Sequence, residues 1–207
     1  MFSKFLAWYP ELKYGYYPVQ FEDMPYDKEY ADNYATLADT DIGRRLNIER
    51  VDLVNKYLGE MDHIITDVGI GDGAFMKEAV FFGRDKVYGY DVNPWAVEKL
   101  IKESRWRDLT KEYTRYATFW DSLEHIPDPR KILARVLDGC FVSIPIFDDA
   151  EHVLRSKHYK KNEHFWYFTK DGFIEYMQRA GFELLEYNRM ESDIGREDIG
   201  TFVFKRV

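Results

Sequence analysis

The sequence predicts an α/β domain with a mostly parallel sheet, helices on both faces and an antiparallel hairpin at the C-terminal end. Three observations predict it. Residues 63–68 form an apolar run that ends in a glycine turn and continues into helix-forming residues 73–82. A second apolar run at 86–91 and a helix begun by Pro94 repeat this alternation, which is typical of parallel sheets. Residues 182–187 and 200–204 have the alternating pattern of a hairpin.

The other elements follow from periodicity and capping. Residues 42–58 carry apolar side chains at helical spacing and end at Gly59, which predicts an amphipathic helix before the first strand. Thr169 and Gly181 are suitable caps for a helix over 170–180. We further expect strands at 117–120 and 139–145, a helix over 127–137, and a short strand hidden in the charged residues 105–116.

Residues 1–40 form an aromatic-rich extension of a single domain that spans residues 41–207. Prolines and a glycine argue against long elements before Pro25. Tyr26, Tyr30 and Tyr34 are spaced to lie on one helix face. We favour packing of this face on the domain body over a lid on the substrate site, although one segment can do both. Tyr26 is counted among the expected substrate contacts.

Composition limits the classes of partner. The 29 basic and 37 acidic residues give a net charge of −8, so the chain as a whole repels polyanions, although a locally basic groove stays open. Cys140 is the single cysteine and is expected to be a buried thiol. No apolar run approaches the ~18 residues of a membrane span, and the first residues lack the apolar core of a signal peptide. We therefore expect a cytoplasmic protein that does not bind nucleic acid non-specifically.

Polar residues follow the predicted strands where a ligand would bind in such a sheet. Asp67 ends the first strand, Asp91 the second and Asp121 a central one. Glycines alternate after Asp67 and allow backbone to approach a ligand at the start of a helix. A carboxylate at Asp91, 18 positions beyond Gly73, is placed to accept hydrogen bonds from the two hydroxyls of a ribose.

Four motifs occur in a fixed order and together are specific: Asp67-Val68-Gly69-Ile70-Gly71-Asp72-Gly73, Tyr90-Asp91-Val92-Asn93-Pro94, Trp120-Asp121-Ser122-Leu123-Glu124-His125-Ile126-Pro127-Asp128-Pro129 and Val142-Ser143-Ile144-Pro145. They resemble those of class I S-adenosylmethionine-dependent methyltransferases, most closely the group that includes the ubiquinone-biosynthesis O-methyltransferases. The resemblance covers roughly residues 60–190. It implies a Rossmann-like fold with a seven-stranded sheet, and S-adenosyl-L-methionine as cofactor with S-adenosyl-L-homocysteine as product.

The resemblance also implies roles for single residues. Asp67 would anchor the amino group of the cofactor, Asp91 would hold its ribose, and Val92 or Asn93 would contact the adenine. Asp108 is the nearest match to the acid that receives the adenine amino group, in a stretch where the motif is indistinct. The remaining expected cofactor contacts are Gly69, Ile70, Gly71, Gly73 and Trp120.

The catalytic residues are expected in the turn after residue 120. Methyl transfer requires alignment of a nucleophile with the sulfonium methyl and removal of its proton. His125 is suited to act as a base, or to fix the loop, and Asp121 and Glu124 flank it. In the ubiquinone-type enzymes the positions matching Asp121, Glu124 and His125 can hold a divalent cation. More members use this stretch as a structural and substrate-facing loop, so no metal is predicted.

The acceptor side is expected in residues 151–167. Its cations, Arg155, Lys157, Lys160 and Lys161, suggest an anionic group on the acceptor, or a solvated basic turn that balances nearby acids. His152, Lys157, His158 and His164 are the expected substrate contacts in this segment. The six-residue spacing of the three histidines fits structural zinc poorly.

Two alternatives stay open at this level. Gly69, Gly71 and Ala74 also fit the fingerprint of a nicotinamide-dependent dehydrogenase, although a second mononucleotide-binding half is missing. A non-catalytic partner that binds S-adenosylmethionine would keep the same glycine and acid motifs.

Overall fold

The computed structural model describes residues 6–19, 36, 38–59 and 63–207. The predicted tyrosine face at Tyr26, Tyr30 and Tyr34 lies outside these residues. Within them, no helix is sufficiently long and apolar to cross a membrane.

The central sheet has six strands in the order β4-β3-β5-β6-β9-β8. Strands β3 (Ile65–Val68), β4 (Val87–Tyr90), β5 (Thr114–Trp120) and β6 (Val136–Pro145) are parallel. Strands β8 (Phe182–Asn188) and β9 (Ile199–Arg206) complete it as the predicted antiparallel pair. The strand expected within residues 105–116 is reduced to one bridge between Gly89 and Trp106 at the outer edge of β4.

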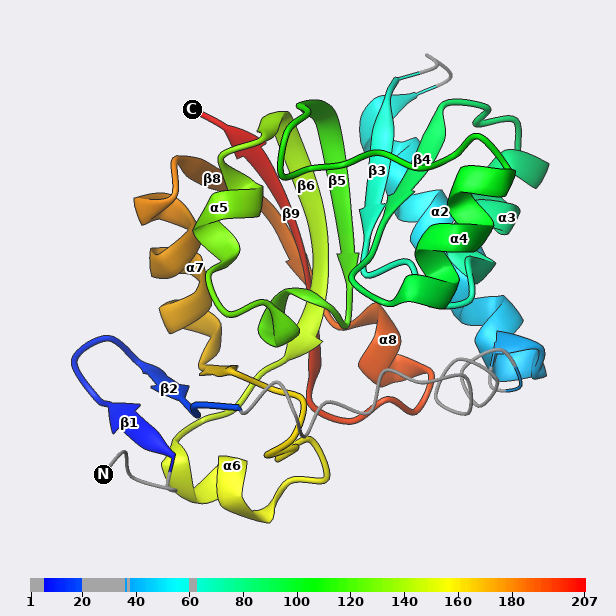
Figure 1. Cartoon of the computed structure of the whole chain (residues 1–207). Coiled ribbons are helices and arrows are strands. Elements are labelled where there is room, and N and C mark those ends of the chain that lie inside the picture. Colours follow the sequence, from blue (N-terminus) through cyan, green and yellow to red (C-terminus); the bar gives the residue numbers. More distant parts are fainter. Residues whose placement is uncertain (1–5, 20–35, 37, 60–62) are drawn as a thin grey trace.

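Helices cover both faces of this sheet (Figure 1). Helices α2 (Asp41–Leu58), α3 (Ala74–Phe81) and α4 (Pro94–Lys102) share one core with side chains of β3, β4 and β6. Helices α5 (Pro129–Leu133) and α7 (Lys170–Arg179) share the other core with Phe119, Cys140 and Phe204. Polar caps fix the starts: the side chains of Thr40, Asn93 and Thr169 accept backbone hydrogen bonds at the starts of α2, α4 and α7.

Several predicted boundaries around α5 were wrong. The helix expected over 127–137 ends at Leu133, because buried Val136 already pairs with Thr114 as the first residue of β6. Strand β5 correspondingly begins at Thr114, three residues before the predicted start. Strand β6 likewise begins three residues before the predicted start at 139 and ends at Pro145 as predicted, and the helix expected over 170–180 is confirmed within one residue.

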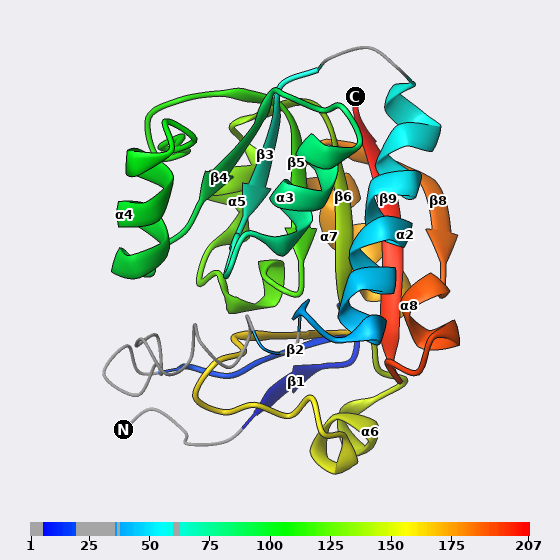
Figure 2. The ribbon, with the colours of Figure 1, turned by 90° about the vertical axis from the view of Figure 1, so that its right-hand side faces the viewer.

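A second, small sheet lies at the carboxyl ends of the parallel strands (Figures 1 and 2). It consists of β1 (Ala7–Tyr9), β2 (Tyr14–Tyr16) and β7 (Trp166–Phe168), all antiparallel. Its aromatic side chains pack edge to face, with Tyr14 5.6 Å from Trp166 and 5.7 Å from Phe168 between ring centroids. The described part of the aromatic extension is thus packed on the domain body. Short helices α6 (Ala150–Arg155) and α8 (Met190–Asp193) lie nearby.

Candidate functional site

A glycine turn joins β3 to α3 and forms one wall of the site. Gly69, Gly71 and Gly73 have φ angles of 74°, 57° and 80°, which glycine adopts without steric cost. A Cβ atom added at Gly69 would lie 2.5 Å from the Cβ atom of Ser122, so the turn packs directly on the chain after β5. A Cβ atom added at Gly71 would meet nothing within 4 Å, because Gly71 borders a cavity.

The carboxylate of Asp91 faces this turn from the end of β4. The backbone N–H groups of Gly71 and Asn93 donate hydrogen bonds to its two oxygens, at 3.1 and 2.8 Å. Burial raises the pKa of Asp91, and the backbone hydrogen bonds oppose that rise. Each carboxylate oxygen keeps a further lone pair, so the group can still accept hydrogen bonds from two neighbouring hydroxyls.

Asp67 lies deeper in the same wall. It is almost fully buried, and its Oδ1 atom accepts a 2.8 Å hydrogen bond from the hydroxyl of Thr118. Burial raises the pKa of Asp67 to about 7, although this hydrogen bond and the charge of Arg50 lower it. Both protonation states are therefore populated near neutral pH, and a cation in the cavity would favour the ionised one.

These groups line one cavity of about 1700 Å³ at the carboxyl ends of the strands. Its lining includes most of the residues predicted to bind the cofactor: Asp67, Gly69, Ile70, Gly71, Asp91, Val92, Asn93 and Trp120. The volume exceeds the ~300–1,000 Å³ of a pocket for one small ligand. The cavity therefore has room for a second molecule beside the first.

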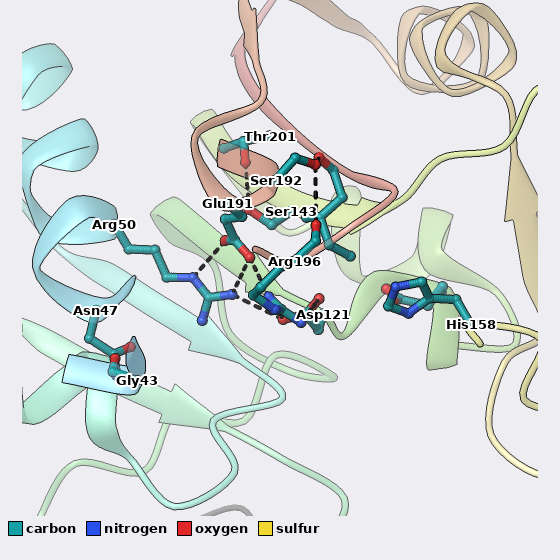
Figure 3. Close-up of polar contacts among 12 residues, drawn as sticks. Gly43, Asn47, Arg50, Asp121, Ser143, His158, Glu191, Ser192, Arg196 and Thr201 are labelled. Atoms are coloured by element: carbon teal, nitrogen blue, oxygen red, sulfur yellow. Dashed lines mark hydrogen bonds and ion pairs between the residues drawn. The ribbon is translucent and has the colours of Figure 1, made fainter. Parts of the chain in front are cut away.

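Four charged side chains form a network at the cavity wall (Figure 3); Arg50, Asp121 and Arg196 line the cavity, and Glu191 lies outside its lining. Asp121, which follows β5, accepts hydrogen bonds from Arg50 of α2 at 3.0 Å and from Arg196 at 2.8 and 3.0 Å. Both arginines also bond Glu191 of α8, whose side chain is fully buried. Although burial opposes ionisation of Asp121, Arg196 and Arg50 hold the pKa of that carboxyl well below its usual value. The four charges sum to zero and fix the cavity wall.

Asp121 itself has a φ angle of 54°, which is unfavourable for a residue with a side chain. Its N–H group donates to the carbonyl of Ser143 at 2.9 Å, and the two arginines hold its side chain. The surrounding contacts thus keep a strained backbone in place at the point where the chain turns into the cavity.

A family model described as a methyltransferase domain matches residues 26–187, which is well over half of the chain. The chain belongs to this methyltransferase family. The resemblance found in its motifs is thereby confirmed at the level of the family. No curated protein is a significant match in sequence.

Solved structures confirm the fold of the methyltransferase. A chain from the complex between the Haloferax volcanii Trm112 methyltransferase activator and the putative methyltransferase matches with a TM-score of 0.66 and 12% identity, covering 88% of this chain and 97% of that one. Magnesium protoporphyrin IX methyltransferase from Synechocystis PCC 6803, solved with bound SAH, matches with a TM-score of 0.62 and 12% identity, and the match covers 88% of this chain and 96% of that one. The 1,6-didemethyltoxoflavin-N1-methyltransferase of Burkholderia thailandensis matches with a TM-score of 0.60 and 17% identity, and the match covers 86% of this chain and 84% of that one.

Of the expected catalytic residues of the methyltransferase, Asp121 and His125 line the cavity, whereas Glu124 lies behind them. Burial, followed by the charge of Lys160, lowers the pKa of His125 to about 4, so its imidazole is neutral at physiological pH. Glu124 is 2% exposed, and burial, followed by the charge of Asp121, raises its pKa well above the usual value. His125 thus presents a neutral imidazole at the cavity wall, and its ring also hydrogen-bonds the backbone of Glu163.

The cation site that the resemblance allows does not fit this methyltransferase. A cation at Asp121, Glu124 and His125 would need an oxygen of Asp121, yet both oxygens accept hydrogen bonds from guanidinium groups. The charges of Arg50 and Arg196 would repel a cation bound there. Asp121 therefore serves as the partner of two arginines.

The basic segment does not reach the cavity of the methyltransferase. His152, Lys157, His158 and His164 are not among the residues that line it. Arg155, Lys157 and Lys160 form ion pairs with Glu151, Glu197 and Glu163. His152 lies between Asp148 and Asp198, and His158 contacts the carbonyl of Glu197. The structure favours the alternative of a solvated turn whose charges are balanced locally.

Asp108 and Gly73 also stay outside the cavity lining. The carboxylate of Asp108 accepts hydrogen bonds from the backbone and hydroxyl of Thr110 and pairs with Lys111. These contacts hold the pKa of Asp108 at about 2. The cavity wall beside it is formed by Leu109, Thr110 and Tyr113 instead, which sequence reasoning missed because residues 105–116 have no regular pattern.

Sequence reasoning also missed Arg50 and Arg196. Arg50 lies four residues from both Leu46 and Val54, so a charged residue on the apolar stripe of α2 was the available signal. Its guanidinium lies 5.0 Å from the centre of the Trp120 ring. No local pattern marks Arg196, which is placed by the loop between α8 and β9.

Proposed function

We propose that this protein transfers the methyl group of S-adenosyl-L-methionine to an oxygen or nitrogen atom of a small or medium-sized acceptor. The carboxylate of Asp91, held by the N–H groups of Gly71 and Asn93 at the edge of the cavity, is the observation that carries the proposal. A ribose with two free hydroxyls is the chemical group that matches it.

With the ribose at Asp91, the other parts of S-adenosylmethionine can be placed in the cavity. The amino group of the methionine end would lie near Asp67, whose pKa of about 7 lets a neighbouring ammonium ion favour the carboxylate. The glycine turn at residues 69–73 lets the backbone approach this end closely. Val92 and Leu109 offer apolar surface to the adenine, with Thr110 beside them, in place of the expected Asp108.

The acceptor would occupy the remaining volume beside Asp121 and His125. Methyl transfer depends mainly on alignment, because the sulfonium methyl is already electrophilic. The neutral imidazole of His125 can accept a hydrogen bond from the nucleophile and orient it, while its low pKa of about 4 makes it a weak base. Lys131 and Arg135 line the cavity and would attract an acceptor that carries a negative charge.

The N-terminal extension, residues 1–40, is proposed to border the acceptor. Ala38 and Thr40, at its end, line the cavity. Tyr26 lies outside the described residues and stays a predicted substrate contact. A Tyr26→Ala variant with an unchanged KM for the acceptor would remove this contact from the proposal.

The experiment that tests the function is methyl transfer from labelled cofactor. The protein is incubated with S-adenosylmethionine carrying a labelled methyl group and with fractionated cell extract. We expect label in a low-molecular-weight fraction, and none with His125→Ala combined with Asp91→Ala. Label in protein or nucleic acid would contradict the small acceptor.

The two alternatives make different predictions. A non-catalytic partner would bind the cofactor and transfer no label to any fraction. A nicotinamide-dependent oxidoreductase would bind NADH. We expect no detectable NADH binding at concentrations at which S-adenosylhomocysteine saturates its site.

A further inference from the structure

Glu124, His125 and His164 converge where the turn after β5 meets the chain that enters β7. The N–H group of Phe165 donates to the carbonyl of Glu124 at 2.9 Å, and the indole of Trp166 donates to the carbonyl of Ile126 at 2.9 Å. These bonds join segments about 40 residues apart in the chain. Each of the three side chains offers one atom able to bind a metal, and these atoms all lie within 4.8 Å of one another.

Two of these side chains are buried with polar atoms that the described residues leave unsatisfied. Glu124 is 2% exposed, and apart from a contact with its own backbone N–H group neither oxygen has a hydrogen-bond partner there. Atom Nδ1 of His164 is buried in the same way. Because buried polar groups are nearly always paired, this junction calls for a further ligand.

The spacing of the three groups suits an ion better than a direct hydrogen bond. Atom Nε2 of His125 is 4.0 Å from Oε1 of Glu124, beyond hydrogen-bond range. Donor atoms about 2.1 Å from a tetrahedral metal stand about 3.4 Å apart, so small side-chain rotations would close the group around an ion. The rings of His125 and His164 are 4.5 Å apart between centroids at an angle of 76°.

The donor set selects the kind of ion. Two imidazoles and one carboxylate are ligands typical of zinc and of other first-row divalent transition metals, whereas magnesium prefers oxygen atoms and water. Asp121 is committed to Arg50 and Arg196, so it adds no oxygen. The ammonium group of Lys160 pairs with Glu163 at 3.3 Å, and its charge helps to lower the pKa of both histidines, so it would weaken the binding of a cation.

We propose that Glu124, His125 and His164 bind one first-row divalent transition-metal ion, such as zinc, at the wall of the cavity. His125 lines the cavity, so an ion enters from that side, while Glu124 and His164 hold it from behind. This set differs from the cation site allowed by the resemblance, because His164 stands in place of Asp121. The proposal does not depend on the identity of the methyl acceptor.

Cobalt titration of the full-length protein tests the site. After treatment with a chelator, the protein is titrated with Co²⁺ while its visible absorption is recorded, and Zn²⁺ is then added. We expect a cobalt band that saturates at one ion per chain and is displaced by zinc. His164→Ala and Glu124→Gln should each weaken cobalt binding at least about tenfold. His152→Ala, which removes an imidazole elsewhere, is the matched control and should bind as the wild type does.

Two further measurements keep the result decisive. Zinc should raise the Tm of the wild type but not of Glu124→Gln, a conservative variant chosen because it keeps the size of the buried side chain. Asp121→Asn should retain the cobalt band. Absence of a saturable band in the wild type, or cobalt binding by His164→Ala and Glu124→Gln that is as tight as that of the wild type, would overturn the proposal. Binding of S-adenosylhomocysteine, measured in the same samples, reports separately on the donor site.

Discussion

At the scale of single residues, the two carboxylates that we propose to bind the methyl donor have different surroundings. Asp91 is held by backbone N–H groups at the cavity edge, whereas Asp67 is buried and bonded to Thr118. Asp91 is oriented to accept hydrogen bonds from hydroxyls, whereas the protonation state of Asp67 depends on nearby charges. The glycine turn lies beside both carboxylates and keeps side chains out of the space between them.

Asp67 predicts a pH dependence of cofactor affinity. Its pKa of about 7 in the free protein means that the carboxyl is largely protonated at pH 5.5 and largely ionised at pH 8. A bound ammonium group favours the ionised form, so affinity for S-adenosylmethionine should rise with pH across this window, by up to about tenfold per unit below the pKa. Calorimetric titrations at half-unit steps measure it.

The control for that titration is Asp67→Asn, which removes the titrating group and keeps its shape. Its affinity should be weaker and nearly flat from pH 5.5 to 7.5. A wild-type profile as flat as that of the variant would contradict the role given to Asp67.

Gly69 predicts a steric effect. Gly69→Ala would place a Cβ atom 2.5 Å from that of Ser122 and at a φ angle of 74°, so the turn must move. We expect loss of donor binding by at least about tenfold, because the site tolerates little displacement. Gly83→Ala is the matched control, since its φ angle of 87° gives the same strain in open space. Equal cofactor affinity in the two variants would argue against close approach at Gly69.

At the scale of elements, much of the fold follows from local pattern. Strong local signals mark three parts of the fold: the unit of β3, glycine turn and α3, the capped starts of α4 and α7, and the C-terminal pair β8 and β9. The boundary at Val136 was missed because its strand identity comes from pairing with Thr114, a contact between distant residues. Asp108 was misjudged because no regular element fixes its direction.

The charge network that joins α2, α8 and the turn after β5 could not be derived from sequence, because its four members lie on three separate segments. It predicts a stability effect. Arg50→Ala leaves the fully buried Glu191 short of two hydrogen bonds and should lower the free energy of unfolding by about 3 kcal/mol. Urea unfolding measures it.

Arg45→Ala in the same helix is the control for this prediction. Its exposed pair with Glu49 should contribute less than about 1 kcal/mol. Similar losses in Arg45→Ala and Arg50→Ala would show that the network stabilises no more than a surface pair does.

At the scale of the whole molecule, the small aromatic sheet is attached to the edge where the site lies. The described part of the N-terminal extension meets the domain at Lys13, whose carbonyl accepts a hydrogen bond from Thr169, and whose side chain pairs with Glu175 at 2.5 Å. The carboxyl ends of the parallel strands thus face a layer that β1, β2 and β7 form (Figure 2).

Gly172 tests how firmly this layer is attached. A Cβ atom at Gly172 would lie 2.1 Å from the carbonyl oxygen of Lys13, so Gly172→Ala forces the turn between β1 and β2 away from α7. We expect a loss of about 1–3 kcal/mol in the free energy of unfolding, as for other overpacked sites. Gln178→Ala, an exposed change in the same helix, should stay within about 0.5 kcal/mol. An unchanged free energy of unfolding in Gly172→Ala would mean that the layer can shift without loss of stability.

The central claim is that Asp91 and the glycine turn hold the ribose and methionine parts of S-adenosylmethionine. Calorimetric titration of wild type and Asp91→Ala with S-adenosylhomocysteine tests it most directly, since the product needs no acceptor to bind. We predict one saturable site in the wild type and binding at least about tenfold weaker in Asp91→Ala, with the far-UV circular dichroism of the two proteins alike. Equal affinity in the two proteins, or no binding by the wild type, would contradict the account.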